Sequence, residues 1–348
     1  MSGRKTLFAS WCTPARLWQT LSDTEGNITQ AADHLGVTRS TIKKFMVRWE
    51  SDEPVGPELP PLPEGDLPVE ELIDIACRRF ANNDLRERAK KWRTIKMPTD
   101  DPFALAWVGD PHVDNDGCNW PRLRHDLTVI AATDGIYGCN IGDTHDNWVG
   151  RLMRLAAESS TTKENAFRLA EWMLVDSGVN WLVWLLGNHD LWNEGHHVFK
   201  QLIRKPRSII LEDWGAQFQI ETPNKQVFRV WAAHNFSGHS LYNSLHGQQR
   251  TAHFQAEADL YIAGHTHNWA LHQEESASRG FVYWLARARG YKFIDDHASR
   301  LGLDSQQEGA TILSVFDPNA HAPAARVQCF ADLDTGADYL KFLRARKK

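Results

Sequence analysis

The stretch WLLGNHD, residues 184–190, decides how the chain is built, because three polar residues follow directly behind an apolar run. The apolar residues are typical of the end of a buried strand, and Gly187 suits a tight turn. Asn188, His189 and Asp190 then stand where the strand ends. Such a cluster predicts a site at the edge of a sheet, provided that other strands end in the same way.

Apolar runs of strand length recur between residues 103 and 330. They are FALAWVG, GIYGCNIG, WLVWLLG, VFRVWAA, ADLYIAG, FVYWLA, ATILSVF and ARVQCF. They contain few charges, as expected of strands that are buried on both faces. Helical stretches such as RLMRLAAESSTTKENAFRLAEWMLV separate some of them. The pattern predicts an α/β core with mixed sheets.

Each of the first five runs ends in a polar cluster. The clusters supply Asp110 and His112, then Asp143 and Asp146, then Asn188, His189 and Asp190, then His234, and finally His265 and His267. In open α/β folds ligands bind outside the carboxyl ends of the strands, so we expect these side chains to meet at one rim. The pairs in DPH and HTH stand at i and i+2, which would point to the same side of an extended chain.

The residue types in these clusters indicate the chemistry. Carboxylate, amide and imidazole ligands without thiolate suit Mn, Fe, Zn or similar divalent ions. Seven candidate ligands exceed what one ion takes, whereas two ions that share a bridging carboxylate would use them all. Two neighbouring ions can activate a water and neutralise a phosphoryl oxygen. The reaction class predicted is phosphoester hydrolysis.

The ordered set of motifs resembles that of the calcineurin-like metallophosphoesterase superfamily. D-P-H, G-D-T-H-D, G-N-H-D, His234 and G-H-T-H occur in the family's order over roughly residues 103–330. The resemblance implies an α+β or α/β fold of four layers, an αββα double β-sandwich, preceded here by a small all-α domain. It also implies two divalent metal ions, with Mn favoured and Fe, Zn, Ni or Mg as alternatives.

The resemblance also implies a role for each motif residue. One ion would take Asp110, His112, Asp143 and His267, and the other would take Asp143, Asn188, His234 and His265. His189 would contact the phosphate and protonate the leaving oxygen as general acid. Asp146 would orient His189 and raise its pKa by its charge. Asp190 would fix the turn.

Other histidines near the motifs leave alternatives open. His239 or His246 could replace His234, which is preferred because it directly follows an apolar run. His145, His196 and His197 are expected to be solvent-exposed polar residues rather than substrate contacts.

The amino-terminal segment ITQAADHLGVTRSTIKKFMVRW resembles a helix-turn-helix. Small Ala32 would let two helices cross closely, Gly36 would make the turn, and Thr38 would cap the second helix. That helix would present a polar and basic face that could enter a major groove and touch phosphates. The face comprises Arg39, Ser40, Thr41, Lys43, Lys44 and Arg48. The alternative is a protein-interaction module with a merely solvated basic face.

Charge blocks and prolines divide the chain into parts. Residues 1–50 carry a net charge of +3, residues 51–75 carry −8 and residues 76–98 carry +6, within a total of −5. We predict a helix-turn-helix domain over 1–50, a solvated linker rich in proline and acid over 51–68, a connecting helix over 69–98 and a catalytic domain over 99–348.

Composition narrows the compartment and the partners. The five cysteines are odd in number and form no C-x-x-C pair, which fits a reducing compartment. No apolar run approaches the ~20 residues of a membrane helix. We therefore expect a cytoplasmic protein without a membrane partner. DNA is the expected partner, and the question of a homo-oligomer stays open.

Three functions fit these observations. The first is a metal-dependent phosphodiesterase or nuclease acting on nucleic acid, with the helix-turn-helix delivering it to DNA, which resembles phage or prophage phosphoesterases and DNA-repair exonucleases. The second is a hydrolase of a small phosphoester, such as a nucleotide or cyclic nucleotide, whose helix-turn-helix only localises or assembles it. The third is a DNA-binding regulator with an inactive catalytic domain, which the complete ligand set disfavours.

Overall fold

The computed structural model describes residues 13–50, 67–192, 199, 209–255, 257–278, 280–293 and 311–346. The chain divides into two compact units, Met1–Ile75 and Ala76–Lys348. Most of the expected linker over 51–68 lies outside the described residues, as does the side chain of Arg48.

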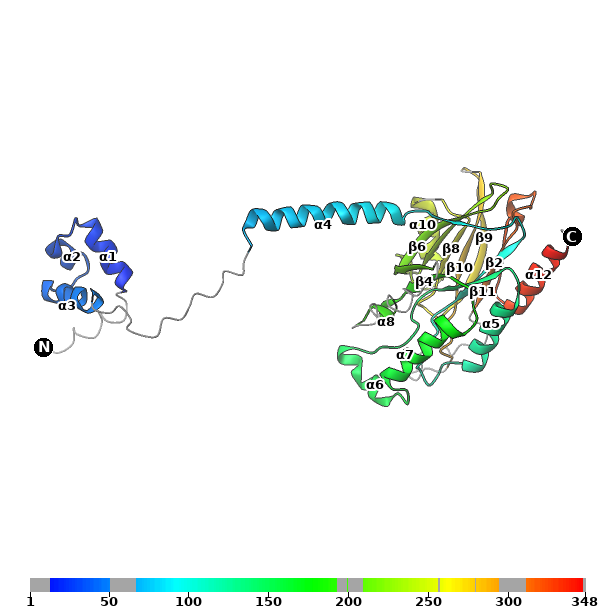
Figure 1. Ribbon diagram of the computed structural model, residues 1–348, viewed down its shortest axis with the longest axis horizontal. Coiled ribbons are helices and arrows are strands. Elements are labelled where there is room, and N and C mark those ends of the chain that lie inside the picture. The colour runs from blue at the N-terminus through cyan, green and yellow to red at the C-terminus, as the bar shows by residue number, and fades with distance from the viewer. Residues whose placement is uncertain are drawn as a thin grey trace. The chain divides into compact units, whose positions relative to one another are not determined.

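Three helices form the described core of the first unit (Figure 1). They are α1 (Pro14–Asp23), α2 (Ile28–His34) and α3 (Arg39–Glu50). The first N–H groups of a helix lack partners within it, and Thr13, Asn27 and Thr38 satisfy them with side-chain oxygens. The bond from Thr41 N to Thr38 Oγ1 is 3.3 Å long, which confirms the predicted cap.

The three helices share one hydrophobic cluster. It consists of Leu17, Leu21, Ala31, Ala32, Leu35 and Ile42. Ala32 is 2% exposed, so its small side chain lies where the helices pack together. Gly36 has a φ of +65°, the left-handed conformation that the turn between α2 and α3 requires. Both predicted roles are confirmed.

A 22-residue helix, α4 (Val69–Lys90), follows, and none of its residues is buried. The helix predicted over 69–98 is too long, because Arg93–Lys96 form the strand β1. Trp92, with a φ of +52°, ends the helical path. Arg93 was counted as part of the helix, but it lies in β1 and pairs with an acid, since its Nη1 lies 2.8 Å from Glu212 Oε1.

Two six-stranded sheets make up the β-structure of the described residues. Their orders are β1-β6-β7-β8-β10-β9 and β12-β11-β2-β3-β4-β5. The strands that were predicted are β2 (Phe103–Val108), β3 (Ile136–Asn140), β4 (Trp181–Leu186), β7 (Val227–Ala233), β8 (Leu260–Ala263), β10 (Phe281–Arg287), β11 (Ile312–Phe316) and β12 (Val327–Phe330). Each sheet contains parallel and antiparallel pairs, so the predicted mixed sheets are confirmed.

Besides β1, three strands were not predicted. They are β5 (Ile210–Asp213), β6 (Gly215–Glu221) and β9 (Ala270–Ser276). In β6 buried residues alternate with half-buried ones, and β5 and β9 are half-buried edge strands. Their polar residues hide the continuous apolar signal that marks a strand covered on both faces.

A hydrophobic cluster takes residues from both sheets. Phe103, Leu105 and Trp107 of β2 meet Phe218 and Ile220 of β6 there. The alternate residues of β2 belong to a second cluster on its other face. All residues of β2 are buried because both faces of the strand are covered.

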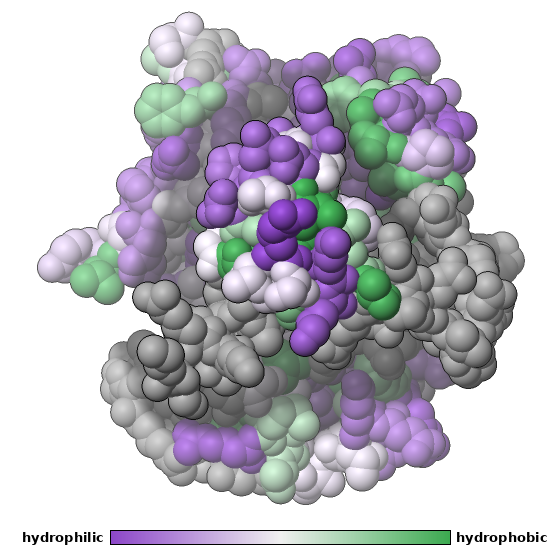
Figure 2. Space-filling view, turned by 90° about the vertical axis from the view of Figure 1, so that its left-hand side faces the viewer, coloured by the Kyte–Doolittle hydropathy of each residue, from purple (hydrophilic) through white to green (hydrophobic). Residues whose placement is uncertain are grey.

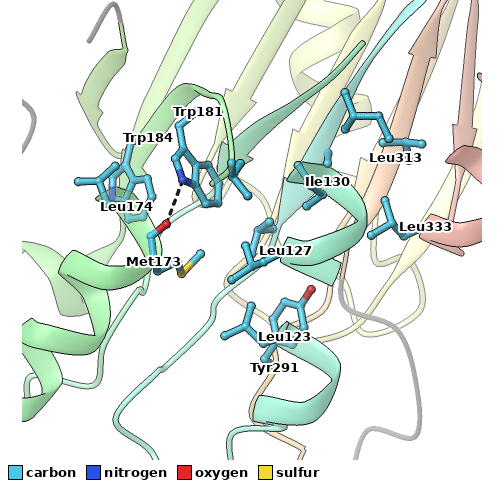
Figure 3. Packing of buried hydrophobic residues seen from close by; sticks show 14 of the residues in the cluster. Leu123, Leu127, Ile130, Met173, Leu174, Trp181, Trp184, Tyr291, Leu313 and Leu333 are labelled. Carbon is cyan, nitrogen blue, oxygen red and sulfur yellow. Dashed lines mark hydrogen bonds between the residues drawn. The ribbon is translucent and has the colours of Figure 1, made fainter. Parts of the chain in front are cut away.

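Helices cover the outer face of the second sheet. They include α5 (Trp120–Ala132), α7 (Lys163–Glu171) and α12 (Leu333–Arg346). Leu123, Leu127 and Ile130 lie on one face of α5 and point into the cluster, as Figure 3 shows. In the same view Trp181 Nε1 donates a 3.1 Å hydrogen bond to the Met173 carbonyl. On the first sheet, α10 (His246–Phe254) contributes to a separate cluster.

The surface in Figure 2 is largely hydrophilic. Where the face is coloured, hydrophobic residues form small separate groups between hydrophilic ones. In the described part of the chain, every helix is too short or too polar to cross a membrane.

Candidate metal centre

The polar clusters lie directly behind β2, β3 and β4 of one sheet and β7 and β8 of the other. Backbone groups join the loops that carry them. His112 N donates to Asp143 O at 3.1 Å, and His265 N donates to Asp110 Oδ2 at 2.5 Å. His189 N donates to Asp143 Oδ1 at 2.9 Å. The structure therefore assembles one rim from both sheets.

The backbone at this rim is strained. Asp110, His112, Asp143, His265 and His267 all have φ between +32° and +71°. Such conformations are uncommon for residues other than glycine and persist where surrounding structure holds them, as at ligand sites. The expectation that the DPH and HTH pairs are extended is therefore wrong. Their shared direction comes from left-handed turns.

Two glycines permit the close approach of these loops. A Cβ on Gly187 would lie 2.2 Å from Asp143 Oδ1, and one on Gly142 would lie 2.6 Å from Gly187 N. Gly142 also has a φ of +108°. The loops after β3 and β4 thus touch at a distance that only glycine allows.

Four atoms with lone pairs meet at one point of the rim. His234 Nε2 lies 3.1 Å from Asn188 Oδ1, 3.2 Å from Asp143 Oδ2 and 3.0 Å from His265 Nδ1. His234 Nδ1 faces the Ile141 carbonyl at 3.0 Å, and a carbonyl only accepts, so Nδ1 carries the hydrogen. In the neutral ring Nε2 then presents a lone pair to the other three atoms. This arrangement calls for a cation at their centre.

The pKa values at this point reflect the crowding of acceptors. Burial opposes the charged form of His234, but Asp143 outweighs it and raises the pKa of His234 to about 9. Despite its burial, Asp143 keeps a pKa well below its usual range because of His234. Burial and the charge of His234 lower the pKa of His265 to about 4. The raised pKa of His234 shows that the neighbouring carboxylates favour a positive charge at this point, which a bound metal ion would supply.

Asp110 lies at the base of the rim and is fully buried. Its Oδ1 lies 3.5 Å from His234 Nδ1 and has no hydrogen-bond partner among the described residues. Its Oδ2 lies 3.7 Å from His267 Nε2. Burial, partly offset by His234, raises the pKa of Asp110 to about 7. An unpartnered buried carboxylate oxygen fits a metal ligand.

A second group lies beside the first. Ligand atoms of His112, Asp146 and His189 lie within 4.8 Å of one another, as do those of Asp143, His234 and His265. Asp143, His234 and His265 all belong to the ligand set expected for one ion. The trio of His112, Asp146 and His189 differs from the set expected for the other ion, which contains His112 but neither Asp146 nor His189. The carboxylate, amide and imidazole donors of both groups fit divalent ions.

Asp146 does not lie as the sequence suggested. Its Oδ1 lies 2.7 Å from His112 Nδ1, and Asn115 Nδ2 donates to its Oδ2 at 2.6 Å. Its backbone carbonyl, rather than its carboxylate, receives Nδ1 of His189. The carboxylate thus orients His112, whose pKa rises to about 9 despite burial.

His189 is held with its Nε2 toward the rim. Because the Asp146 carbonyl binds Nδ1, that nitrogen carries the hydrogen, and Nε2 lies 3.9 Å from Asp143 Oδ2. Burial and the charge of His112 lower the pKa of His189, contrary to the rise expected from Asp146. Trp148 and Trp192 flank the ring, with centroids 4.9 Å and 4.3 Å away.

Asp190 fixes the turn after β4, as predicted. Its Oδ2 accepts from Gly187 N at 3.0 Å, and its Oδ1 accepts from Thr144 N at 2.9 Å. The same Oδ1 lies 3.2 Å from His145 Nδ1. His145 is 1% exposed, so its expected exposure to solvent is wrong, and His196 and His197 lie outside the described residues.

The alternatives to His234 lie elsewhere. His239 and His246 are exposed, whereas His234 is fully buried among the acceptors described above.

Sequence reasoning missed Arg287, which supports the loop that carries His265 and His267. Its buried guanidinium donates to Gly264 O at 2.7 Å and to Thr266 Oγ1 at 2.9 Å. The available signal was a charged residue at the end of an apolar run. A charge buried in a strand is costly unless hydrogen bonds or an ion pair compensate it, so such a residue points to specific partners.

The first unit carries a second candidate surface on α3. Arg39, Ser40, Lys43 and Lys44 are exposed, Thr41 is half-buried, and the side chain of Arg48 lies outside the described residues. Ser40 and Thr41 hydroxyls lie 2.9 Å and 2.8 Å from Thr38 Oγ1 at the start of the helix. Ile42 faces the core, so the basic side chains lie on the solvent side.

The site is thus a cluster of acceptor side chains suited to divalent metal ions, and the first unit is a helix-turn-helix. Residues 15–44 match the sequence profile described as Bacterial regulatory protein, Fis family. No curated protein matches the chain.

Among solved structures, the chain is similar to wild-type Vps29 complexed with Zn²⁺ from Entamoeba histolytica. The two are 11% identical with a TM-score of 0.34, over 66% of this chain and 97% of that one. A single mutant of the same protein is 12% identical with a TM-score of 0.32 and the same coverage. At these values we draw nothing from either structure about the activity of this chain.

Proposed function

We propose that the protein is a dinuclear-metal-dependent phosphoesterase of the calcineurin-like type, a phosphodiesterase or nuclease that acts on nucleic acid. The observation that carries this proposal is the convergence of His234 Nε2, Asn188 Oδ1, Asp143 Oδ2 and His265 Nδ1. The two sheets with helices outside them are consistent with the αββα sandwich of that superfamily.

The proposed ligands divide between two ions that share Asp143. Asp110, His112, Asp143 and His267 would hold one ion, and Asp143, Asn188, His234 and His265 would hold the other. When bound, such ions activate water and neutralise the charge of phosphoryl oxygens. Manganese is the favoured metal on the ligand types, and Fe, Zn, Ni or Mg fit the same donors.

His189 would act as the general acid at the leaving oxygen. Its Nδ1 hydrogen is held by the Asp146 carbonyl, so Nε2 faces the rim and is the atom that can release a proton there. Asp146 would act through position, because its carbonyl holds His189 while its carboxylate holds His112. A lowered pKa makes the proton easier to release once the imidazolium has formed.

The helix-turn-helix would deliver this activity to DNA. Its exposed cations on α3 would contact phosphates, and the start of the helix would face the base edges. The Fis-family match of residues 15–44 supports this reading.

The proposal is tested by incubating the full chain with Mn²⁺ and end-labelled linear DNA, single- and double-stranded. We expect metal-dependent degradation that EDTA abolishes and fresh Mn²⁺ restores. Hydrolysis of a generic diester without degradation of either DNA would reject the nuclease assignment. The absence of hydrolysis of any phosphoester would reject the phosphoesterase itself.

A second candidate function is hydrolysis of a small phosphoester, and one observation favours it. A cavity of 260 Å³ lies beside Thr266 and Arg287, and the segment 235–246 forms much of its wall. A pocket of this size suits a small substrate better than a polymer. Cleavage of nucleotides or cyclic nucleotides in preference to DNA would favour this function.

DNA binding predicts a defined salt dependence. We expect the triple variant Arg39→Ala, Lys43→Ala, Lys44→Ala to bind duplex DNA more weakly by at least tenfold, and the slope of log affinity against log salt to fall by up to ~0.9 for each lost phosphate contact. Fluorescence anisotropy at several salt concentrations measures both. Hydrolysis of a small diester should not change, because the catalytic residues lie in the other unit.

The matched control removes three exposed cations of the second unit, Lys225, Lys341 and Arg346, by alanine. It should keep the wild-type affinity and slope. If both triple variants lost the same DNA affinity, the net charge of the protein would explain the loss, and the role of α3 would be contradicted.

A further inference from the structure

A cavity of 330 Å³ lies beside the general acid and is not used by the metal chemistry. Its walls include His145, Asn147, Trp148, Met153 and Ala166. The volume falls in the ~300–1,000 Å³ range of pockets that bind small molecules. On its other side, Trp148 packs edge-to-face on His189 at 4.9 Å. The Trp148 indole therefore contacts the His189 ring and also lines the cavity.

The cavity has an aromatic and apolar side. Trp148 is half-buried, Met153 lies at the surface with 55% exposure, and Ala166 is buried on α7. The Lys292 ammonium lies 5.3 Å from the centre of the Trp148 ring. Trp148 thus supplies an indole to the wall of the cavity, and planar rings stack on indole rings.

Polar groups also line the cavity. His145 is 1% exposed, and its Nε2 has no hydrogen-bond partner among the described residues. Asp114 lies beside it, with Oδ1 bound to the backbone N of Asp146 at 2.7 Å. Hydroxyl-bearing residues from 159 to 162 complete the rim. Asp114 and these hydroxyl groups offer acceptors and donors to the polar edge of a ligand.

The walls are held in place from outside the cavity. Asn147 Nδ2 donates to the His189 carbonyl at 3.1 Å and to the Trp192 carbonyl at 2.6 Å. Ser160 donates through its hydroxyl to Asp116, and its backbone N donates to the same carboxylate at 3.2 Å. The loop after β3 and the segment before α7 are therefore tied to the catalytic rim and to the loop after β2.

We propose that this cavity binds a nucleobase of the substrate, stacked on Trp148 with its polar edge toward Asp114 and the hydroxyl-bearing residues 159–162. A base combines a planar aromatic ring with donors and acceptors on its edge, which matches the aromatic and the polar groups of the cavity wall. The inference rests on the proposed phosphoesterase function, and it identifies the substrate as a nucleotide or a nucleic acid. The scissile phosphate lies at His189 while the attached base enters the cavity.

The test compares four dinucleoside phosphate substrates with Mn²⁺: TpT, the two forms that lack one base, and the form that lacks both. We expect the wild-type kcat/KM to fall by at least about tenfold when the base on one particular side of the phosphate is missing, and to change little when the other base is missing. Tenfold is about the effect of one base stacked on an aromatic ring. Trp148→Ala and the cavity-filling Met153→Trp should bring the ratio of kcat/KM with and without that base close to one. Trp172→Ala, which removes an indole outside the cavity, should leave it unchanged.

Two results overturn the inference: a wild-type ratio near one, or a preference that persists in both cavity variants. If no diester is hydrolysed, the proposed phosphoesterase function is rejected, but the base site is not yet tested. Equilibrium dialysis of thymidine against the metal-free full chain then tests whether the cavity binds a base. Saturable binding that Met153→Trp abolishes supports the base site. The base site is rejected if thymidine does not bind, or if the wild type and Met153→Trp bind it equally. Comparing TpT with a single-stranded oligonucleotide then shows whether the base comes from a small nucleotide or a polymer.

Discussion

Asp143→Asn is expected to abolish phosphoester hydrolysis and to weaken the binding of Mn²⁺ strongly. Both oxygens of Asp143 are committed, since Oδ1 accepts from His189 N and Oδ2 lies 3.2 Å from His234 Nε2. An amide removes the negative charge and turns one acceptor into a donor that faces other groups. We expect kcat to fall by at least about 10²–10³-fold, the loss seen when one electrostatic stabiliser of a transition state is removed.

The variant is measured by initial rates on a small diester and by isothermal titration with Mn²⁺. Asp338→Asn is the matched control, because it removes one carboxylate from the exposed face of α12 and should leave both quantities unchanged. Far-ultraviolet circular dichroism checks that Asp143→Asn folds. Wild-type turnover by a folded Asp143→Asn variant would remove Asp143 from the site.

His189→Ala is expected to lower kcat for an alkyl leaving group by about 10²–10⁴-fold, the usual contribution of a general acid. The loss should be much smaller for a p-nitrophenyl ester, whose leaving group needs no proton. Mn²⁺ affinity should stay near that of the wild type, because His189 belongs to neither proposed ligand set.

The three readouts separate two roles for His189. One of its ring nitrogens lies within 4.8 Å of a ring nitrogen of His112 and of a carboxylate oxygen of Asp146, a spacing that a metal ligand would also show. A loss of Mn²⁺ affinity together with equal losses for both leaving groups would make His189 a ligand and contradict the general-acid role. His253→Ala, on the exposed face of α10, is the control for removing one imidazole.

Much of the architecture was predictable because the predicted strands are nearly all apolar. Both faces of β2 are covered, so the strand reads as a continuous run, and all eight such runs form strands. The strands β5, β6 and β9 were missed because polar residues interrupt their apolar runs, whereas the edge strand β12 was predicted although it also alternates in burial. The end of α4 was missed because helical spacing and charge do not reveal that Arg93 pairs with Glu212.

The helix-turn-helix was predictable in more detail because its signals are local. Thr38 bonds a residue three positions away, and Gly36 needs only its own φ to make the turn. The small side chain of Ala32 allows two short helices to cross closely, and this property can be read from the residue type alone.

Within the candidate site, the order of the motifs predicted which side chains meet but not how they face each other. Asp146 and His189 were expected to pair through the carboxylate, yet the carboxylate faces His112. His145 was expected in solvent, yet Phe167 and Phe199 pack on it at 5.1 Å and 5.5 Å. These outcomes depend on side chains from distant segments, which compete for the same partners.

The sequence by itself determined the residue types at the ends of five strands, the helix-turn-helix and the class of metal that such donors suit. Only the tertiary structure decided that His234 Nε2 faces three acceptors, that left-handed turns aim the DPH and HTH pairs, and that a cavity opens behind Trp148. The physical reason is that ligand type and local turns follow from neighbours along the chain. Orientation, burial and empty volume follow from the packing of two sheets and their loops against one another.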